Sequence, residues 1–197
     1  MSARPPFAVA ARELLRDTLL DAALDQLADN HWADVRLADI AAGAGVSRQT
    51  LYNEFGSRDG VAQALIMREA ERFSDAIEQV LNAHLDDPKA ALGAAAELFL
   101  EAAARNALVR AVAAGSADEM LALVTTHGRP VVEHASERLR HAIEERWPEA
   151  GERAADLLAD FLVRLAISYV TLPGGPPAET ADAIAELLGP YVDSVLP

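Results

Sequence analysis

The chain has 197 residues, 51% of them hydrophobic but only 5% aromatic, so aliphatic side chains and alanine must fill its core. The absence of cysteine excludes disulfides, thiolate metal sites and a cysteine nucleophile. The net charge of −14 argues against nucleic-acid binding unless positive charge gathers on one contact surface. No apolar run is long enough to span a membrane, and acidic residues follow the start too soon for a secretory signal. We therefore expect a cytoplasmic protein without membrane contact.

Helical periodicity runs through almost the whole chain, and the 42 alanines favour helix as well. Gly45 marks a tight turn, Ser47 and Asp59 are the expected N-caps of the helices that follow them, and Asp87-Pro88 predicts another helix start. No segment is typical of a strand, so the sequence predicts an all-α fold. The predicted helices cover residues 8–29, 35–44, 47–55, 60–85, 88–106, 107–114, 117–126, 129–147, 152–171 and 178–195.

Residues 36–55 form two short predicted helices around the turn at Gly45. Val46 fills the angle between them, and Leu51 and Phe55 face inward on the second helix. Its remaining side chains suit the DNA major groove, because arginine reads guanine, glutamine or asparagine reads adenine, and hydroxyl groups donate to phosphates. On periodicity alone, a simple helical hairpin with a polar exposed face is an equal alternative.

Residues 37–59 resemble the signature of the tetracycline-repressor (TetR) family, above all in the pattern Val46-Ser47-x-x-Thr50-Leu51-Tyr52-x-x-Phe55-x-x-Arg58. The resemblance in motif covers about residues 12–65, and length and helix order fit beyond it. It implies a dimeric transcription regulator with an N-terminal three-helix helix-turn-helix DNA-binding domain at 1–58. Residues 59–197 then form a helical effector-binding and dimerisation domain. We expect the DNA contacts to come from Arg36, Ser47, Arg48, Gln49, Thr50, Tyr52, Asn53 and Arg58.

Two positions depart from the family pattern. Glu54 stands where histidine is usual, and Arg58 where lysine is usual. We expect Arg58 to hold a phosphate, and Glu54 to face away from the DNA backbone or to pair with Arg58. The first 60 residues carry six arginines and nine acids. The expected positive surface is therefore small, which predicts a shallow salt dependence of DNA binding; it comprises Arg4, Arg12, Arg36, Arg48 and Arg58.

The last two predicted helices each carry an apolar stripe. In the TetR family these two helices pair with their symmetry mates as a four-helix bundle, while an ordinary intramolecular core is the alternative. A two-fold dimer would place two recognition helices about one DNA turn apart, which predicts a palindromic operator. The expected dimer interface comprises Leu158, Phe161, Leu162, Leu165, Ile184, Leu188, Tyr191 and Val195.

The predicted helix 88–106 has a face of alanine and glycine, which either permits close helix packing or leaves a cavity. A cavity lined by apolar groups with a few polar ones would take a small lipophilic effector, such as an acyl chain or a hydrocarbon. Arg138 and Arg164 are further polar candidates for its wall. The expected ligand-binding residues are Leu98, Phe99, Ala102, Asn106, Leu121, His127, His134 and Phe161.

Other chemistry finds little support. His127, His134 and His141 recur every seven residues, which is about 10 Å per step along a helix and too far to share one metal ion. His141 and Glu145 are spaced for an exposed ion pair. No phosphate-binding glycine loop or GxSxG motif is present, so we expect no metal, no cofactor and no enzymatic activity. Two function classes remain, a ligand-released transcriptional repressor and a helical binding module that has lost DNA reading.

Overall fold

The computed structural model describes residues 7–115, 118–125 and 127–196. Every described element is helical, so the predicted all-α fold is confirmed. Only the two short 3-10 helices, η1 and η2, were absent from the prediction. None of the described helices combines the length and the hydropathy that a membrane crossing requires. In chain order the elements are α1 (Phe7–Asp29), η1 (Trp32–Asp34), α2 (Leu37–Gly43), α3 (Arg48–Phe55), α4 (Arg58–Ala83), α5 (Pro88–Arg105), α6 (Ala107–Ala113), α7 (Asp118–Val124), α8 (Arg129–Arg146), η2 (Pro148–Ala150), α9 (Glu152–Thr171) and α10 (Pro177–Val195).

Local side-chain chemistry explains where several helices begin. The hydroxyl of Ser47 accepts a hydrogen bond from the backbone of Thr50, and the carboxylate of Asp87 does the same for Ala90, as expected of N-caps. The predicted cap of α4 was wrong. Ser57, not Asp59, caps that helix, because its extended backbone lets its hydroxyl accept from the Gly60 N–H at 3.0 Å.

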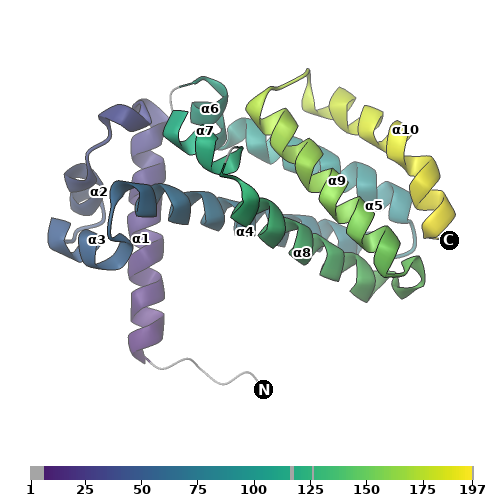
Figure 1. The fold of residues 1–197 in the computed structure, drawn as a ribbon, viewed down its shortest axis with the longest axis horizontal. Coiled ribbons are helices and arrows are strands. Elements are labelled where there is room, and N and C mark those ends of the chain that lie inside the picture. The colour runs from purple at the N-terminus through teal and green to yellow at the C-terminus, as the bar shows by residue number, and fades with distance from the viewer. Residues whose placement is uncertain (1–6, 116–117, 126, 197) are drawn as a thin grey trace.

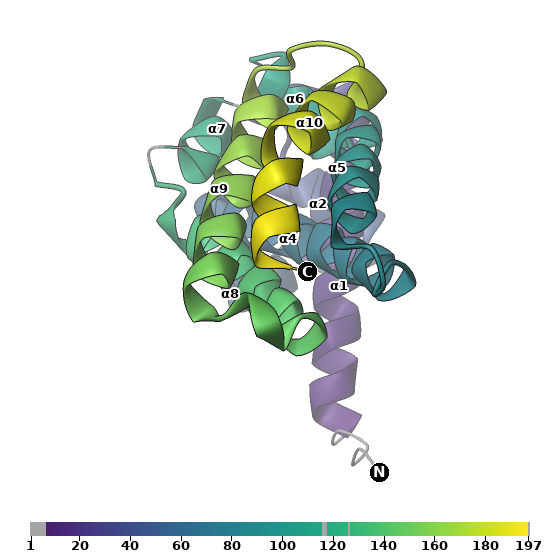
Figure 2. The same ribbon diagram turned by 90° about the vertical axis from the view of Figure 1, so that its right-hand side faces the viewer.

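The helix α4 connects the two parts of the molecule. Figure 1 shows α1, α2 and α3 gathered around the start of α4, while the rest of α4 runs into a bundle with α5, α8, α9 and α10. Figure 2 shows the same bundle end-on, with α1 extending away from it. The α5 and α10 helices pack closely at Gly93, where an added Cβ would lie 3.7 Å from the side chain of Ala185. Close helix packing, one of the two alternatives for α5, therefore accounts for one of its faces.

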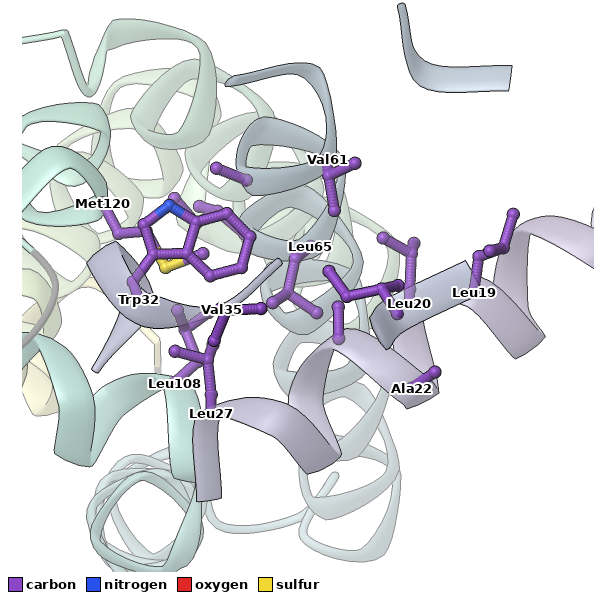
Figure 3. Close-up of a cluster of buried hydrophobic side chains, with 14 of the residues drawn as sticks. Leu19, Leu20, Ala22, Leu27, Trp32, Val35, Val61, Leu65, Leu108 and Met120 are labelled. Atoms are coloured by element: carbon purple, nitrogen blue, oxygen red, sulfur yellow. The ribbon is translucent and has the colours of Figure 1, made fainter. Parts of the chain in front are cut away.

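A continuous hydrophobic core joins the N-terminal helices to α6 and α7. Trp32 is almost fully buried at its centre, and Leu65 of α4, Leu108 of α6 and Met120 of α7 lie around it (Figure 3). A second core, which includes Ile143 and Leu158, lies in the bundle. The predicted domain boundary at 58/59 coincides with the start of α4 but stays a prediction, because the first core extends across it.

Candidate functional site

The α2-turn-α3 segment forms the expected polar surface. Gly45 adopts φ +69° in the turn, a conformation that favours glycine. Leu51 is fully buried, and Val46 and Phe55 pack against the first core, so these three residues hold α3 in place as predicted. Most of the predicted DNA-contacting residues are exposed, namely Arg36, Ser47, Arg48, Gln49 and Asn53. Two of them, Thr50 and Tyr52, are partly buried.

The exposed side chains of α3 already form ordered pairs. Arg48 donates to the Tyr52 hydroxyl at 3.2 Å, and its guanidinium group lies 5.3 Å from the centre of the tyrosine ring. Gln49 donates to the Asn53 side-chain oxygen at 2.8 Å. These pairs favour particular rotamers of four polar side chains at the surface of α3.

Arg58 turns toward the segment that precedes α2. Its guanidinium group donates to the carbonyl oxygens of Trp32 and Val35 and lies 4.7 Å above the Trp32 ring. These contacts turn Arg58 inward and join the start of α4 to the segment before α2. Arg58 thus has a structural role in the fold, while its expected phosphate contact stays a prediction.

Glu54 instead pairs with α1. Its carboxylate accepts from Arg12 Nε at 3.0 Å and from Arg16 Nη1 at 2.6 Å, and only 8% of its side chain is exposed. Burial, the largest single influence, acts to raise the pKa of Glu54, but the hydrogen bonds and charges of the two arginines together outweigh it and lower the pKa. The paired carboxylate is therefore ionised. Arg12 forms this pair while its side chain stays 65% exposed, so its expected phosphate contact stays a prediction, and Arg4 lies outside the described residues.

An apolar cavity of about 220 Å³ lies between α4, α5, α6, α8, α9 and α10. Phe99, Ala95 and Leu92 of α5 line one side, and Leu162 and Leu165 of α9 line another. A cavity, the second alternative for the small face of α5, therefore exists beside the closely packed face. Its walls are almost entirely hydrophobic, which suits a lipophilic guest.

Of the predicted ligand-binding residues, Phe99 lines this cavity and the other seven do not. Phe161 and His127 are exposed at the surface, and Leu121 packs against the first core. The other polar candidates, Arg138 and Arg164, do not line the cavity either. They form ion pairs with carboxylates on α4 and α9. Leu98, Ala102, Asn106 and His134 are partly buried outside the lining.

A buried polar network stands where α4 passes from the N-terminal helices to the cavity. Arg68, 7% exposed, donates to the Asp17 carbonyl of α1 at 3.0 Å and pairs with Asp21 at 2.8 Å. The adjacent Glu69, 5% exposed, accepts from Asn106 at 2.6 Å and also lines the cavity. Asn106 is thus a partner of the cavity wall rather than part of it. Sequence patterns gave no signal for this network, because its members come from α1, α4 and the α5–α6 junction.

The predicted dimer residues divide between two faces. Leu158 and Ile184 are buried inside the protomer, and Leu162 and Leu165 line the cavity, so these four do not form an outer surface. Leu188 and Val195 pack against the second core. Phe161 and Tyr191 are exposed, as are Leu157 and Leu187, which belong to the same two predicted apolar stripes. We call these four exposed residues of α9 and α10 the α9–α10 apolar face.

The histidines do not converge. His127 is exposed, His134 lies 3.9 Å from the Glu71 carboxylate, and His141 forms the predicted exposed pair with Glu145 at 3.1 Å. Within the described part of the chain, no group of three or more histidine, aspartate or glutamate side chains is arranged to hold a metal ion.

Comparisons with known proteins agree with this geometry. Residues 19–65 match the model of the tetR family of bacterial regulatory proteins, and residues 87–190 match that of a bacterial tetracycline-repressor C-terminal domain. The HTH-type transcriptional regulator AlkX of Mycobacterium tuberculosis is 37% identical over 191 residues, covering 96% of this chain and 90% of that protein.

Solved structures extend the comparison to the fold. The TetR family repressor AlkX of Dietzia sp., implicated in biodegradation of n-alkanes, is 34% identical and has a TM-score of 0.82, with 92% of this chain and 97% of that one covered. A TetR-family regulator of Pectobacterium atrosepticum shares the fold, with 19% identity, a TM-score of 0.68 and coverage of 95% and 96%. The chain belongs to the TetR family of DNA-binding transcriptional regulators, which are not enzymes.

Proposed function

We propose that this regulator is a homodimeric repressor that binds a palindromic operator and is released by a small lipophilic effector held in the cavity. The observation that carries the proposal is the apolar cavity beside α4, the helix whose first turns belong to the DNA-binding core. The Dietzia relative is implicated in biodegradation of n-alkanes, which supports a long-chain hydrocarbon or a derived acyl chain as effector.

The α9–α10 apolar face supports the dimer. Phe161 is 58% exposed and Leu187 75% exposed in the protomer. Large exposed apolar side chains on the two last helices are typical of an interaction surface, and association by two-fold symmetry would bury the same residues on both subunits. A dimer through this face would carry two copies of α3 and would therefore recognise a palindrome.

The polar network supplies a path from the effector to the DNA. Glu69 forms part of the cavity wall, and its neighbour Arg68 holds α1. An effector that displaces this part of α4 would shift α1 and α3 with it, and so change the separation of the two recognition helices. Release requires that the effector bind the shifted state more tightly, since a ligand with equal affinity for both states changes nothing.

The second candidate function is a helical binding module that no longer recognises DNA. The negative charges of Glu54 and of the N-terminal region favour it. The charge of Glu54 is compensated by two arginines, so it does not present an uncompensated anion beside α3.

One experiment tests the proposal. DNA is selected from a random pool by the purified protein, and the selected duplex is used in gel shifts with increasing concentrations of n-alkanes, 1-alkanols and fatty acids of matched chain length. We expect a palindromic consensus, a dimer bound to each site, and release by at least one of the three series. Failure of every series to release the DNA would contradict the effector part of the proposal.

A further inference from the structure

Three charged side chains join α1 to the recognition helix α3. The Glu54 carboxylate, near the end of α3, is held by Arg12 and Arg16, which lie one turn apart on α1. Arg16 also lies 4.9 Å from the centre of the Phe55 ring. We call Arg12, Arg16 and Glu54 the α1–α3 clamp. Glu54 is nearly buried in it, whereas Arg12 remains 65% exposed and Arg16 38% exposed.

The clamp adjoins a cleft on one side and an apolar contact on the other, because Arg16 also covers the Phe55 ring. A cleft of about 460 Å³ lies beside it, lined by Arg16 and Leu20 of α1, by Glu54 and Phe55 of α3, and by part of α4. Apolar packing also holds α3, through the buried Leu51 and through Phe55, which packs against the first core. The charge pairing adds to this packing at the end of the recognition helix that faces α1, and so contributes to the tilt of α3 toward α1.

We propose that Glu54 is a positioning residue for DNA recognition, because its clamp helps to set the tilt of α3 and withholds Arg12 and Arg16 from DNA phosphates. Base reading needs side chains such as Arg48 and Gln49 in a fixed relation to the base edges, whereas phosphate binding tolerates many arrangements. The clamp would thus favour sequence-specific over non-specific binding. This inference rests on the proposed base-reading role of α3, and a wild-type protein that selects no DNA sequence would refute that role instead.

Replacing Glu54 tests the clamp directly. In Glu54→Gln the side chain keeps its size but loses its charge, so both arginines become available to phosphates. We expect non-specific binding to strengthen and the salt dependence to steepen, by about one unit of log–log slope for each arginine released. Discrimination between the selected duplex and a scrambled one should fall roughly tenfold, a loss similar to that of one base contact.

A second variant breaks the clamp from the other side. Arg16→Gln leaves Glu54 held by Arg12 alone and removes an arginine instead of releasing two, so discrimination should fall without a steeper salt dependence. The matched control is Glu133→Gln, which removes the same charge from an exposed pair with Arg129 on α8. This control should keep the discrimination and the salt dependence of the wild type.

The measurement is fluorescence anisotropy with labelled selected and scrambled duplexes over a series of salt concentrations, together with the melting temperature of each variant. Loss of discrimination in both clamp variants, with a steeper slope in Glu54→Gln only, supports the proposal. Unchanged discrimination in either clamp variant overturns it, even if the melting temperature falls, because the clamp would then serve stability alone. An equal steepening in Glu133→Gln overturns it too, since net charge would then explain the slope.

Discussion

Filling the cavity should separate effector binding from DNA binding. Ala95 lies on α5 with its side chain in the cavity wall, close to Leu92 and Phe99 in the same lining. Ala95→Trp would project an indole ring into this space. Because the cavity lies in the bundle and not beside α3, the variant should still bind its operator but no longer release it.

The size of the cavity sets the expected magnitude. Its volume of about 220 Å³ equals the liquid volume of roughly seven water molecules. Methylene groups are of similar size, so a chain of about seven methylenes would gain on the order of 5 kcal/mol at 0.8 kcal/mol each. An indole in place of a methyl hydrogen adds about nine non-hydrogen atoms and so takes most of this space. Losing about 3 kcal/mol of effector binding would raise Kd by more than 100-fold.

Isothermal titration with an effector found in the DNA-release screen measures this loss, and a gel shift measures the retained operator binding. Overpacking typically costs the fold about 1–3 kcal/mol, which the melting temperature of the variant will report. Ala104→Trp is the matched control, since Ala104 is exposed on the same helix and outside the lining. An Ala95→Trp protein that binds effector with wild-type affinity would refute the assignment of this cavity.

Three further predictions concern the DNA surface, the dimer and pH. Arg48→Ala should weaken the selected operator by about 1–3 kcal/mol and relax one base position, while Tyr52→Phe should weaken all sequences alike, as competition binding with single-base operator variants will report. Phe161→Asp should convert the dimer to a folded monomer in sedimentation velocity, because the new carboxylate is solvated in the protomer but would be buried and unpaired in the interface. Folding lowers the pKa of Glu54, so its contribution to stability is present above about pH 4.3 and is lost as the pH falls through the lowered folded value. The free energy of unfolding of Glu54→Gln, measured with urea, should therefore fall less with acid than that of the wild type.

Helix positions followed from the sequence because their signals are local. Caps such as Ser47 and Asp87 act within three residues, and the turn at Gly45 needs one residue that accepts positive φ. The error at α4 has the same origin. Ser57 and Asp59 both suit an N-cap, and only the backbone conformation at residue 57 decides between them.

The faces of the helices in the bundle did not follow from the sequence. Leu158, Leu162 and Leu165 recur at helical spacing, and so do Leu157 and Phe161, so α9 is apolar on two sides. Periodicity predicts that both apolar sides of such a helix are covered. It does not tell which side packs inside the protomer and which side meets another molecule. In the folded chain the first set faces the protomer interior and the second faces outward. This ambiguity is why the predicted dimer interface mixed both sets, and why only Phe99 of the predicted ligand site lines the cavity.

The acidity of the chain and its DNA-binding family are compatible because charge pairing decides which arginines remain available. Arg12 and Arg16 are engaged by Glu54, and Arg58 by backbone carbonyls, so three of the arginines in the N-terminal region stabilise its structure. Arg36 and Arg48 are left at the surface of α2 and α3 among the described residues up to residue 60. With few phosphate contacts, we expect non-specific affinity to be weak and its salt dependence to be shallow. Specific binding then depends on the exact placement of α3, which makes the contacts that orient this helix as important as those that touch DNA.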